Sequence, residues 1–298
     1  MKGVRQGCLL SPYLFNIMCE VLKRLALEGF EGGFRIGGRL VTNLRYADDI
    51  VLIASNESEL QDIVTRLHWA ACEMSMKINV KKTEVMKADD DLTPIKVPVA
   101  GVYLRQVHSF KYLGAYFNSD ATCTQEIKSR LAVGRERMAQ LNTLWRSRAI
   151  SNPLKAQLIQ ALIWPIVTYG AEAWTLNKEL TRNIEVFEMQ CYRRSMKVPY
   201  TEHVSNDTIL ERVKRGRGLL ASVKSHKLKH FGHTTRHNSL AKDIMLGPIQ
   251  GKRRQGGQRK QWADDLREWT GLTIPDLVHL AQDRATYRKF VHAVANAR

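Results

Sequence analysis

The stretch that most constrains this chain is LRYADDIVLIA (residues 44–54), in which two aspartates interrupt an apolar run typical of a β-strand. Burying even one unpaired carboxylate is costly, so residues 40–54 predict a β-hairpin with Asp48 and Asp49 at its polar tip. A solvated β-turn, where aspartate is common, would explain the pair without any function. Two carboxylates on a rigid tip would instead suit Mg²⁺, which prefers hard oxygen ligands.

The charge of the chain indicates a polyanionic partner. The 298 residues carry a formal net charge of +17, and the excess grows towards the C-terminus. The first 117 residues hold 15 basic and 13 acidic side chains, whereas residues 201–298 hold 19 and 9. A soluble protein with a basic tail is the plainer interpretation, but this distribution favours nucleic acid as the partner.

Two classes of protein are disfavoured. The five cysteines are scattered and never form a C-x-x-C pair, which argues against a disulfide framework and a cysteine zinc site, and favours a reducing compartment. No apolar run is long enough to span a bilayer, and no secretory signal is recognisable, so we expect no membrane partner. The expected location is intracellular, either nuclear or cytoplasmic.

The order of the predicted elements gives an α+β chain. Ser11 is a plausible N-cap for a first helix, and Asn56 with Glu59 forms a capping box for a second. Residues 77–88 and 110–117 look like strands, so we expect an antiparallel sheet with helices on one face. Later segments predict helices, at residues 124–148, from 151–153 onward, 178–196 and 275–296.

Several blocks, in order, resemble the reverse transcriptases of non-LTR (LINE-type) retrotransposons. They are GVRQGCLLSP, YADD, INVKKTEVM, FKYLGAYF, PIVTYGAEAW and HKLKHFGHTTRH, and together they cover nearly the whole chain. The resemblance implies an RNA-directed DNA polymerase with a partial palm at residues 1–118, a helical thumb at 119–200 and a basic nucleic-acid-binding region at 201–298. It also implies two-metal nucleotidyl transfer on an RNA template and a DNA primer, with an RNA–DNA duplex as the bound form.

The resemblance carries roles onto individual residues. Asp48 and Asp49 would bind Mg²⁺ or Mn²⁺, and Lys82 of the N-x-x-K-T pattern would act as a general acid at the leaving pyrophosphate. The residues that would touch the nucleotide or template are Arg5, Gln6, Gly7 and Tyr46. The primer would be gripped by Tyr112, Leu113 and Gly114. The plainer alternatives are a loop whose glycines serve geometry only, and an ordinary surface lysine.

The family's catalytic set also needs a third carboxylate, on a strand upstream of the block that resembles GVRQGC. The resemblance therefore implies that this chain lacks that strand and the template-holding fingers. On this basis we expect a poor polymerase that exposes apolar surface and associates readily, including with another chain that covers the missing half of the palm.

The C-terminal third contains further candidate contacts. GKRRQGGQRK (residues 251–260) could clamp a nucleic-acid backbone or act as a nuclear import signal, through Lys252, Arg253, Arg254, Arg259 and Lys260. Four histidines, at positions 226, 230, 233 and 237, suggest zinc, but the basic neighbours Lys227, Lys229 and Arg236 favour phosphate contact. We expect the tryptophans at 145, 164, 174, 262 and 269 to be core residues rather than base-stacking platforms.

Three hypotheses for the function stay open. The chain is a polymerase by descent, a nucleic-acid-binding module that has lost its chemistry, or a non-functional retroelement remnant. Intact Asp48, Asp49, Gln6 and Lys82 favour descent from an active enzyme. The expected loss of the upstream strand favours the other two.

Overall fold

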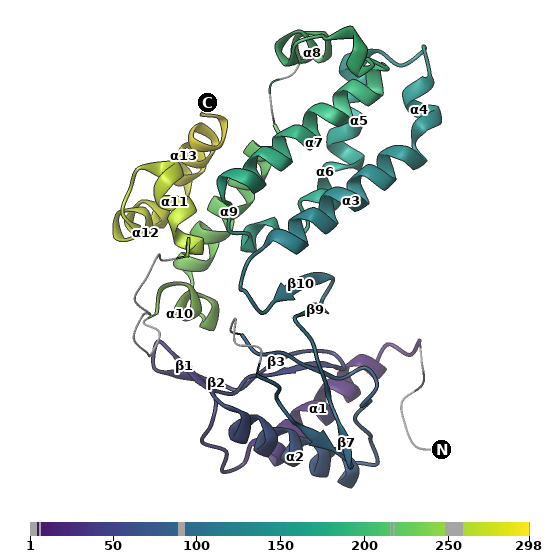
Figure 1. The fold of residues 1–298 in the computed structure, drawn as a ribbon. Coiled ribbons are helices and arrows are strands. Elements are labelled where there is room, and N and C mark those ends of the chain that lie inside the picture. The colour runs from purple at the N-terminus through teal and green to yellow at the C-terminus, as the bar shows by residue number, and fades with distance from the viewer. Residues whose placement is uncertain are drawn as a thin grey trace. The chain divides into compact units, whose positions relative to one another are not determined.

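The computed structural model describes residues 5, 7–88, 93–214, 216, 218–247 and 259–297. The chain divides into two compact units, which Figure 1 draws as ribbons. Unit 1 comprises Met1–Ala121 and Leu240–Arg253, and unit 2 comprises Thr122–Ser239 and Arg254–Arg298. Helices and short strands are both present, which confirms the expected α+β class.

Unit 1 contains three helices among its described residues: α1 (Ser11–Leu27), α2 (Glu57–Glu73) and α10 (Leu240–Leu246). Its described strands form separate pairs rather than the single sheet that the sequence predicts. The antiparallel pairs are β1 (Phe34–Ile36) with β2 (Arg39–Val41), β3 (Asn43–Tyr46) with β4 (Asp49–Leu52), β6 (Pro98–Val99) with β7 (Val102–Tyr103), and β9 (Ser109–Tyr112) with β10 (Ala115–Asn118). One pair is parallel, β5 (Glu84–Val85) with β8 (Arg105–Gln106).

The segment that carries Lys82 contains a turn that shortens strand β5. The backbone carbonyl of Asn79 accepts hydrogen bonds from the N–H groups of Lys82 and Thr83, at 3.0 and 2.9 Å. These bonds close a turn, because they use donors that a strand would offer to its neighbour. Only Glu84 and Val85 are left to pair with β8, so the strand predicted over 77–88 is wrong.

Helices α1 and α2 pack against each other in unit 1. The contact is made by Leu22 and Ala26 of α1 with Ala70 and Ala71 of α2, all of which are buried. Leu10, and not Ser11, is the N-cap of α1, and the Ser11 hydroxyl donates to the Arg5 carbonyl instead. The cap predicted at Asn56 is confirmed, since its side chain accepts the Glu59 N–H at 2.9 Å.

The outer face of α1 is apolar and exposed. Leu14 is 53% exposed and Ile17 62%, and Tyr13, Val21 and Leu25 are exposed beside them. These residues recur every three or four positions, so they form a stripe along the helix. Unit 1 therefore has the exposed apolar surface that the sequence predicts.

We expect this stripe to make the chain self-associate at micromolar concentration, and Ile17→Lys to shift it towards monomer. A charge in the middle of the stripe breaks the apolar contact that association would bury. Sedimentation velocity measures the shift, with Val186→Lys as the control because Val186 is an exposed valine of unit 2. A wild-type chain that sediments as a single monomer would contradict the expectation.

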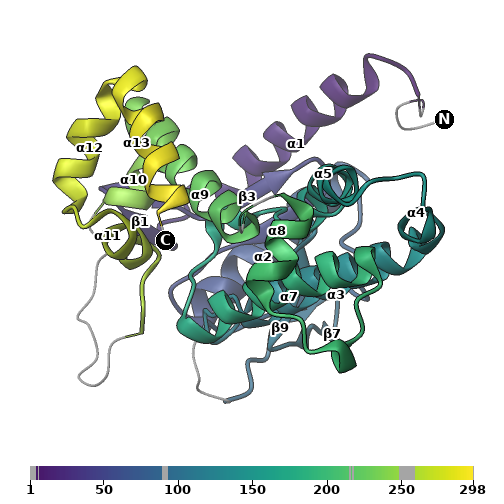
Figure 2. The same cartoon turned by 90° about the horizontal axis from the view of Figure 1, so that it is seen from above.

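Unit 2 is helical throughout its described residues. Its longer helices are α3 (Thr124–Gln140), α5 (Asn152–Leu162), α7 (Lys178–Met196), α8 (Asn206–Val213), α9 (Leu219–Arg236), α11 (Trp262–Thr270), α12 (Ile274–Gln282) and α13 (Arg284–Asn296). The shorter elements are α4 (Asn142–Arg146), α6 (Trp164–Val167), η1 (Ala171–Ala173) and η2 (Tyr200–Glu202). Figure 2 shows α3 and α7 running beside each other, and these two helices are in contact.

Two sequence predictions for unit 2 have different outcomes. The helix predicted at 178–196 is confirmed as α7. The single helix predicted at 275–296 is wrong, because the chain breaks at Asp283 between α12 and α13. The Asp283 carboxylate accepts the N–H groups of Ala285 and Thr286, so it starts a new helix there.

Many buried side chains of unit 2 form one large core cluster. Trp145, Trp164 and Trp174 belong to it, as predicted, whereas Trp262 and Trp269 are only half-buried. All five cysteines are unpaired, which agrees with the expected absence of disulfides. No helix in the described ranges is long and apolar enough to cross a membrane.

Candidate active site

The aspartate pair lies at the tip of the β3–β4 hairpin. Tyr46 pairs with Asp49 across the two strands, so the turn consists of Ala47 and Asp48. Ala47 has a positive φ of 52°, a conformation that this tight turn requires. Both carboxylates are exposed, so the aspartates interrupt the apolar run without being buried in it. The predicted hairpin and its polar tip are confirmed.

Arg45 anchors this hairpin to helix α1. Its Nη1 donates to the Cys19 carbonyl at 2.8 Å, and its Nη2 donates to the Glu20 carboxylate at 2.8 Å. Glu20 also pairs with Lys23 and Arg24, at 3.2 and 3.3 Å. The hydrogen bond from Arg45, followed by those from Lys23 and Arg24, lowers the pKa of Glu20 from 4.5 to about 2. The strand that leads into the aspartates is thus tied to α1 by a charged cluster.

We expect the anchor to weaken in acid. The folded-state pKa of Glu20 is depressed, so its contribution to stability is present above the unfolded value and is lost as pH falls from about 4.5 to about 2. Chemical unfolding of wild type and Glu20→Gln between these pH values measures the difference. The two proteins should differ at neutral pH and converge in acid, and a constant difference would contradict the cluster.

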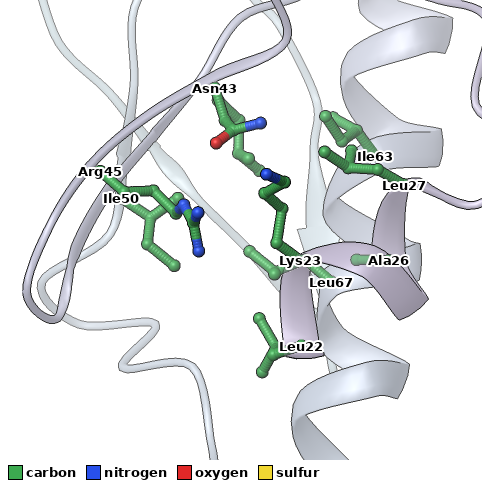
Figure 3. A pocket seen from close by; sticks show the side chains of 10 residues that line it. Leu22, Lys23, Ala26, Leu27, Asn43, Arg45, Ile50, Ile63 and Leu67 are labelled. Carbon is green, nitrogen blue, oxygen red and sulfur yellow. The ribbon is translucent and has the colours of Figure 1, made fainter. Parts of the chain in front are cut away.

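Packing behind the hairpin leaves no room for a ligand. Figure 3 shows Arg45 and Ile50 of the hairpin facing Leu22 and Lys23 of α1. The gap between them measures about 10 Å³, which is barely the space of one water molecule. A ligand could therefore reach this hairpin at its exposed tip but not in a pocket beneath it.

A second hairpin lies close to the first. Strands β9 and β10 join through Leu113 and Gly114, which both have positive φ, and Phe110 stacks on Phe117 across the pair at 5.5 Å. Burial raises the pKa of Tyr112, and the charge of Asp49 raises it further. The charge of Asp49 therefore acts on Tyr112, which links a predicted metal ligand to a predicted primer-gripping residue.

Asp48 has a different neighbour. Burial raises the pKa of the Cys19 thiol. The charge of Arg45 lowers this pKa, and the charge of Asp48 raises it. Cys19 is in α1 and Tyr112 is in β9, so the charge of Asp48 acts on a residue of α1 and the charge of Asp49 acts on a residue of β9. Chain segments that are far apart in the sequence thus meet around the tip.

The other predicted site residues lie on exposed turns of unit 1. Arg5 and Gly7 precede α1, where the Arg5 carbonyl accepts the Cys8 N–H and the Ser11 hydroxyl. Gly7 has a φ of 86°, which favours glycine. Tyr46 is 65% exposed beside the aspartates, and Lys82 is exposed on the turn closed by Asn79. Gln6 lies outside the described residues.

The donor set can be tested against a metal ion. Among the residues that the structure describes, no group of three or more His, Cys, Asp or Glu side chains could hold one. Asp48 and Asp49 offer hard carboxylate oxygens on an exposed tip, which fits Mg²⁺ or Mn²⁺ as two ligands of a larger set. The remaining positions would need water, substrate or another carboxylate.

Comparison with known proteins identifies the region that contains the hairpin. Residues 1–117, which contain both hairpins and α1, match the family model described as reverse transcriptase (RNA-dependent DNA polymerase). The chain contains a reverse transcriptase-like region of the non-LTR type.

Relatives of the reverse transcriptase-like region come from mobile elements. A transposon-derived protein of Caenorhabditis elegans is 29% identical over 78% of this chain and 87% of its own length. The Pol polyprotein of retrotransposable element R2 from Nasonia vitripennis is 31% identical over 40% of this chain. The RNA-directed DNA polymerase of mobile element jockey from Drosophila funebris is 25% identical over 66% of it. The match spans only 12% and 22% of these last two proteins.

Outside the reverse transcriptase-like region, two predicted phosphate contacts have other partners. Lys227 is fully buried and cannot reach a phosphate, because its Nζ binds Asp265 at 2.5 Å and the Trp174 carbonyl at 2.7 Å. Lys260 pairs with Asp265 at 2.8 Å and Glu268 at 2.6 Å. Arg259 is exposed. Lys252, Arg253 and Arg254 lie outside the described residues.

Sequence reasoning missed two groups of interacting residues. The Arg45–Glu20 anchor joins positions 25 residues apart, and the Lys227–Asp265 pair joins positions 38 apart. The only signal in the sequence for the Arg45–Glu20 anchor was a charged residue, Arg45, inside an apolar strand. The sequence holds no signal for the Lys227–Asp265 pair, because a lysine among basic neighbours is expected on the surface.

Proposed function

We propose that the reverse transcriptase-like region is a nucleotidyl-transfer site of RNA-directed DNA polymerase type. In this proposal Asp48 and Asp49 are the ligands of Mg²⁺ or Mn²⁺. The observation that supports it most is the exposed pair of carboxylates on a hairpin tip that Arg45 ties to α1, with the charge of Asp49 acting on Tyr112. Its substrates would be an RNA template, a DNA primer and deoxynucleoside triphosphates.

Each site residue has a defined task in this proposal. Divalent ions held by Asp48 and Asp49 would supply positive charge at the attacking 3′-oxygen and the leaving phosphates. Lys82 is exposed and would give a proton to the leaving pyrophosphate. Tyr112, Leu113 and Gly114 would hold the primer end beside Asp49. Arg5, Gln6, Gly7 and Tyr46 would orient the nucleotide and template.

The same proposal assigns parts to the units. Residues 1–118 would be part of a palm, 119–200 a thumb, and 201–298 a basic region that binds nucleic acid. Since the described residues offer Asp48 and Asp49 without a third nearby carboxylate, we propose that the chain alone extends primers poorly. A ligand lost from such a site misplaces the reacting groups, and a misplacement of about 1 Å can cost about a hundredfold. Another chain that supplies the carboxylate would also cover the apolar stripe of α1.

Mg²⁺-dependent primer extension on an RNA template tests the proposal, with Asp48→Asn as the matched control. Asparagine keeps the size of the side chain and removes the charge that binds metal. We expect weak extension by wild type and none by the variant, while both bind the RNA–DNA duplex equally. Equal extension by the two proteins would refute the role of Asp48.

A second candidate function is nucleic-acid binding without chemistry, which the net charge of +17 favours. It predicts no extension, together with salt-dependent duplex binding that weakens when Lys252, Arg253 and Arg254 are neutralised. A folded wild-type chain with neither extension nor binding would leave a non-functional retroelement remnant as the remaining hypothesis.

A further inference from the structure

Helix α9 of unit 2 carries four histidines on one face and no acidic side chain. His226, His230, His233 and His237 are all exposed. Their spacing of four, three and four residues places them in a nearly straight row along the helix. We call this row the imidazole stripe. Lys229 is exposed next to it, and the rings of His233 and His237 lie 4.8 Å apart.

The stripe has the dimensions of a nucleic-acid strand segment. Eleven residues of α-helix separate its ends, which corresponds to about 17 Å. Phosphates of one strand advance about 3.4 Å along a duplex axis, so the stripe spans about five nucleotides. The last two histidines also lie in the final turn of α9, or just beyond it, where the helix dipole favours positive charge.

Three carboxylates of the elements packed around α9 bind other partners. Glu188 of α7 accepts the Gly218 and Leu219 N–H groups at the start of α9, at 2.7 and 3.2 Å. Asp265 of α11 pairs with Lys227 and Lys260, and Asp276 of α12 accepts the Thr273 hydroxyl. Helix α13 has no carboxylate. The other acidic residues on these elements are Glu172, Glu179, Glu185, Asp264 and Glu268.

Basic residues are also present on the same elements. They are Lys178, Arg182, Arg193, Arg194, Arg267, His279, Arg284, Arg288, Lys289 and His292. Within the described ranges no ion pair joins any of these carboxylates to an imidazole of the stripe, and no group of three ligands there could hold a metal. The stripe is therefore neither internally neutralised nor a metal centre.

We propose that the imidazole stripe, with Lys229, is a contact surface for the phosphate backbone of a nucleic acid, and that protonation of its histidines strengthens this contact. The inference rests on the nucleic-acid partner of the proposed function, but not on catalysis. Histidine is the side chain whose charge most readily responds to mild acid, so acid adds positive charge to a row of imidazoles. Each phosphate that they neutralise releases counterions and steepens the salt dependence of binding.

Fluorescence anisotropy with a labelled RNA–DNA duplex of about 20 base pairs tests the proposal, at about pH 8 and pH 5.5 across a salt series. The test variant is the full-length chain with His226→Gln, His230→Gln, His233→Gln and His237→Gln. The matched control carries His279→Gln and His292→Gln, which replace exposed histidines on α12 and α13. Circular dichroism at both pH values verifies that all three proteins are folded.

We expect wild type and control to bind at least about tenfold more tightly at pH 5.5, with a salt slope steeper by about two to four. The stripe variant should bind the duplex as tightly as wild type at pH 8 and should gain little affinity at pH 5.5. The stripe proposal is overturned if the variant gains as much duplex affinity between pH 8 and pH 5.5 as wild type does, or if wild type gains none. Either result leaves the proposed function intact. A wild type that binds no duplex at either pH would overturn both. If wild type binds the duplex more tightly in acid but does not extend a primer, only the polymerase proposal is overturned.

Discussion

Replacing Lys227 with methionine is expected to destabilise unit 2 by about 3–5 kcal/mol. Lys227 and Asp265 are both fully buried, and their atoms Nζ and Oδ2 lie 2.5 Å apart. Removing the lysine leaves a buried carboxylate with only the Leu176 N–H at 3.0 Å and the partly exposed Lys260 as partners. It also deprives the Trp174 carbonyl of its donor, and removes a cation 4.7 Å from the centre of the Trp262 ring.

Urea unfolding of three variants isolates the unpaired charge from the loss of packing. Lys229→Met alters an exposed lysine of the same helix and should leave the free energy of unfolding nearly unchanged. The double variant Lys227→Met with Asp265→Asn keeps an acceptor for the Leu176 N–H but removes the buried charge, so it should be more stable than Lys227→Met alone. A loss below about 1 kcal/mol for Lys227→Met would mean that the pair is hydrated in solution.

Replacing Arg45 with methionine is expected to weaken Mn²⁺ binding at Asp48 and Asp49 and to reduce any primer extension by about a hundredfold. Arg45 makes two hydrogen bonds of 2.8 Å to α1, so it holds the strand that leads directly into the turn. Methionine keeps an unbranched apolar stem, although a shorter one, and loses both bonds. The carboxylates would then be on a tip free to shift by the ångström or so that metal geometry does not tolerate.

Titration with Mn²⁺, followed by water proton relaxation, measures this effect without requiring activity. Arg24→Met is the matched control, because Arg24 contacts the same Glu20 carboxylate but is largely exposed and does not touch the hairpin. Arg45→Lys should give an intermediate affinity, since an ammonium keeps the charge but not the forked pair of bonds. Equal Mn²⁺ affinity in Arg45→Met and wild type would show that the anchor does not position the aspartates.

The parts of the fold that the sequence predicts best are governed by local chemistry. The hairpin at the aspartates follows from alternating apolar arms around a polar turn, and α7 follows from apolar spacing after the Asn177 cap. The capping role of Asn56 is equally local. In each case the decisive interactions join residues within a few positions of one another, which a linear pattern can reveal.

The failures are of two kinds, local signals that the apolar pattern does not register and contacts between distant segments. The length of β5 depends on the backbone N–H groups that the Asn79 turn uses. The division of the last helix depends on the single carboxylate of Asp283. For the candidate site, the sequence predicts the aspartates and their tip, but not that the charge of Asp49 acts on Tyr112 or that Arg45 holds the strand. Those relations join distant segments, so only the folded chain reveals them.

Helix α10 interleaves the two units along the chain. It belongs to unit 1, where Asp243 pairs with Arg39 at 2.8 Å, yet it follows α9 of unit 2 in the chain. The β1–β2 turn at Gly37 also lies close against Asp243 and Gly247. A recombination event that joined residues 1–121 to foreign sequence would therefore strip unit 1 of a piece encoded more than a hundred codons downstream. Unit 1 therefore depends on residues that follow much of unit 2 in the chain.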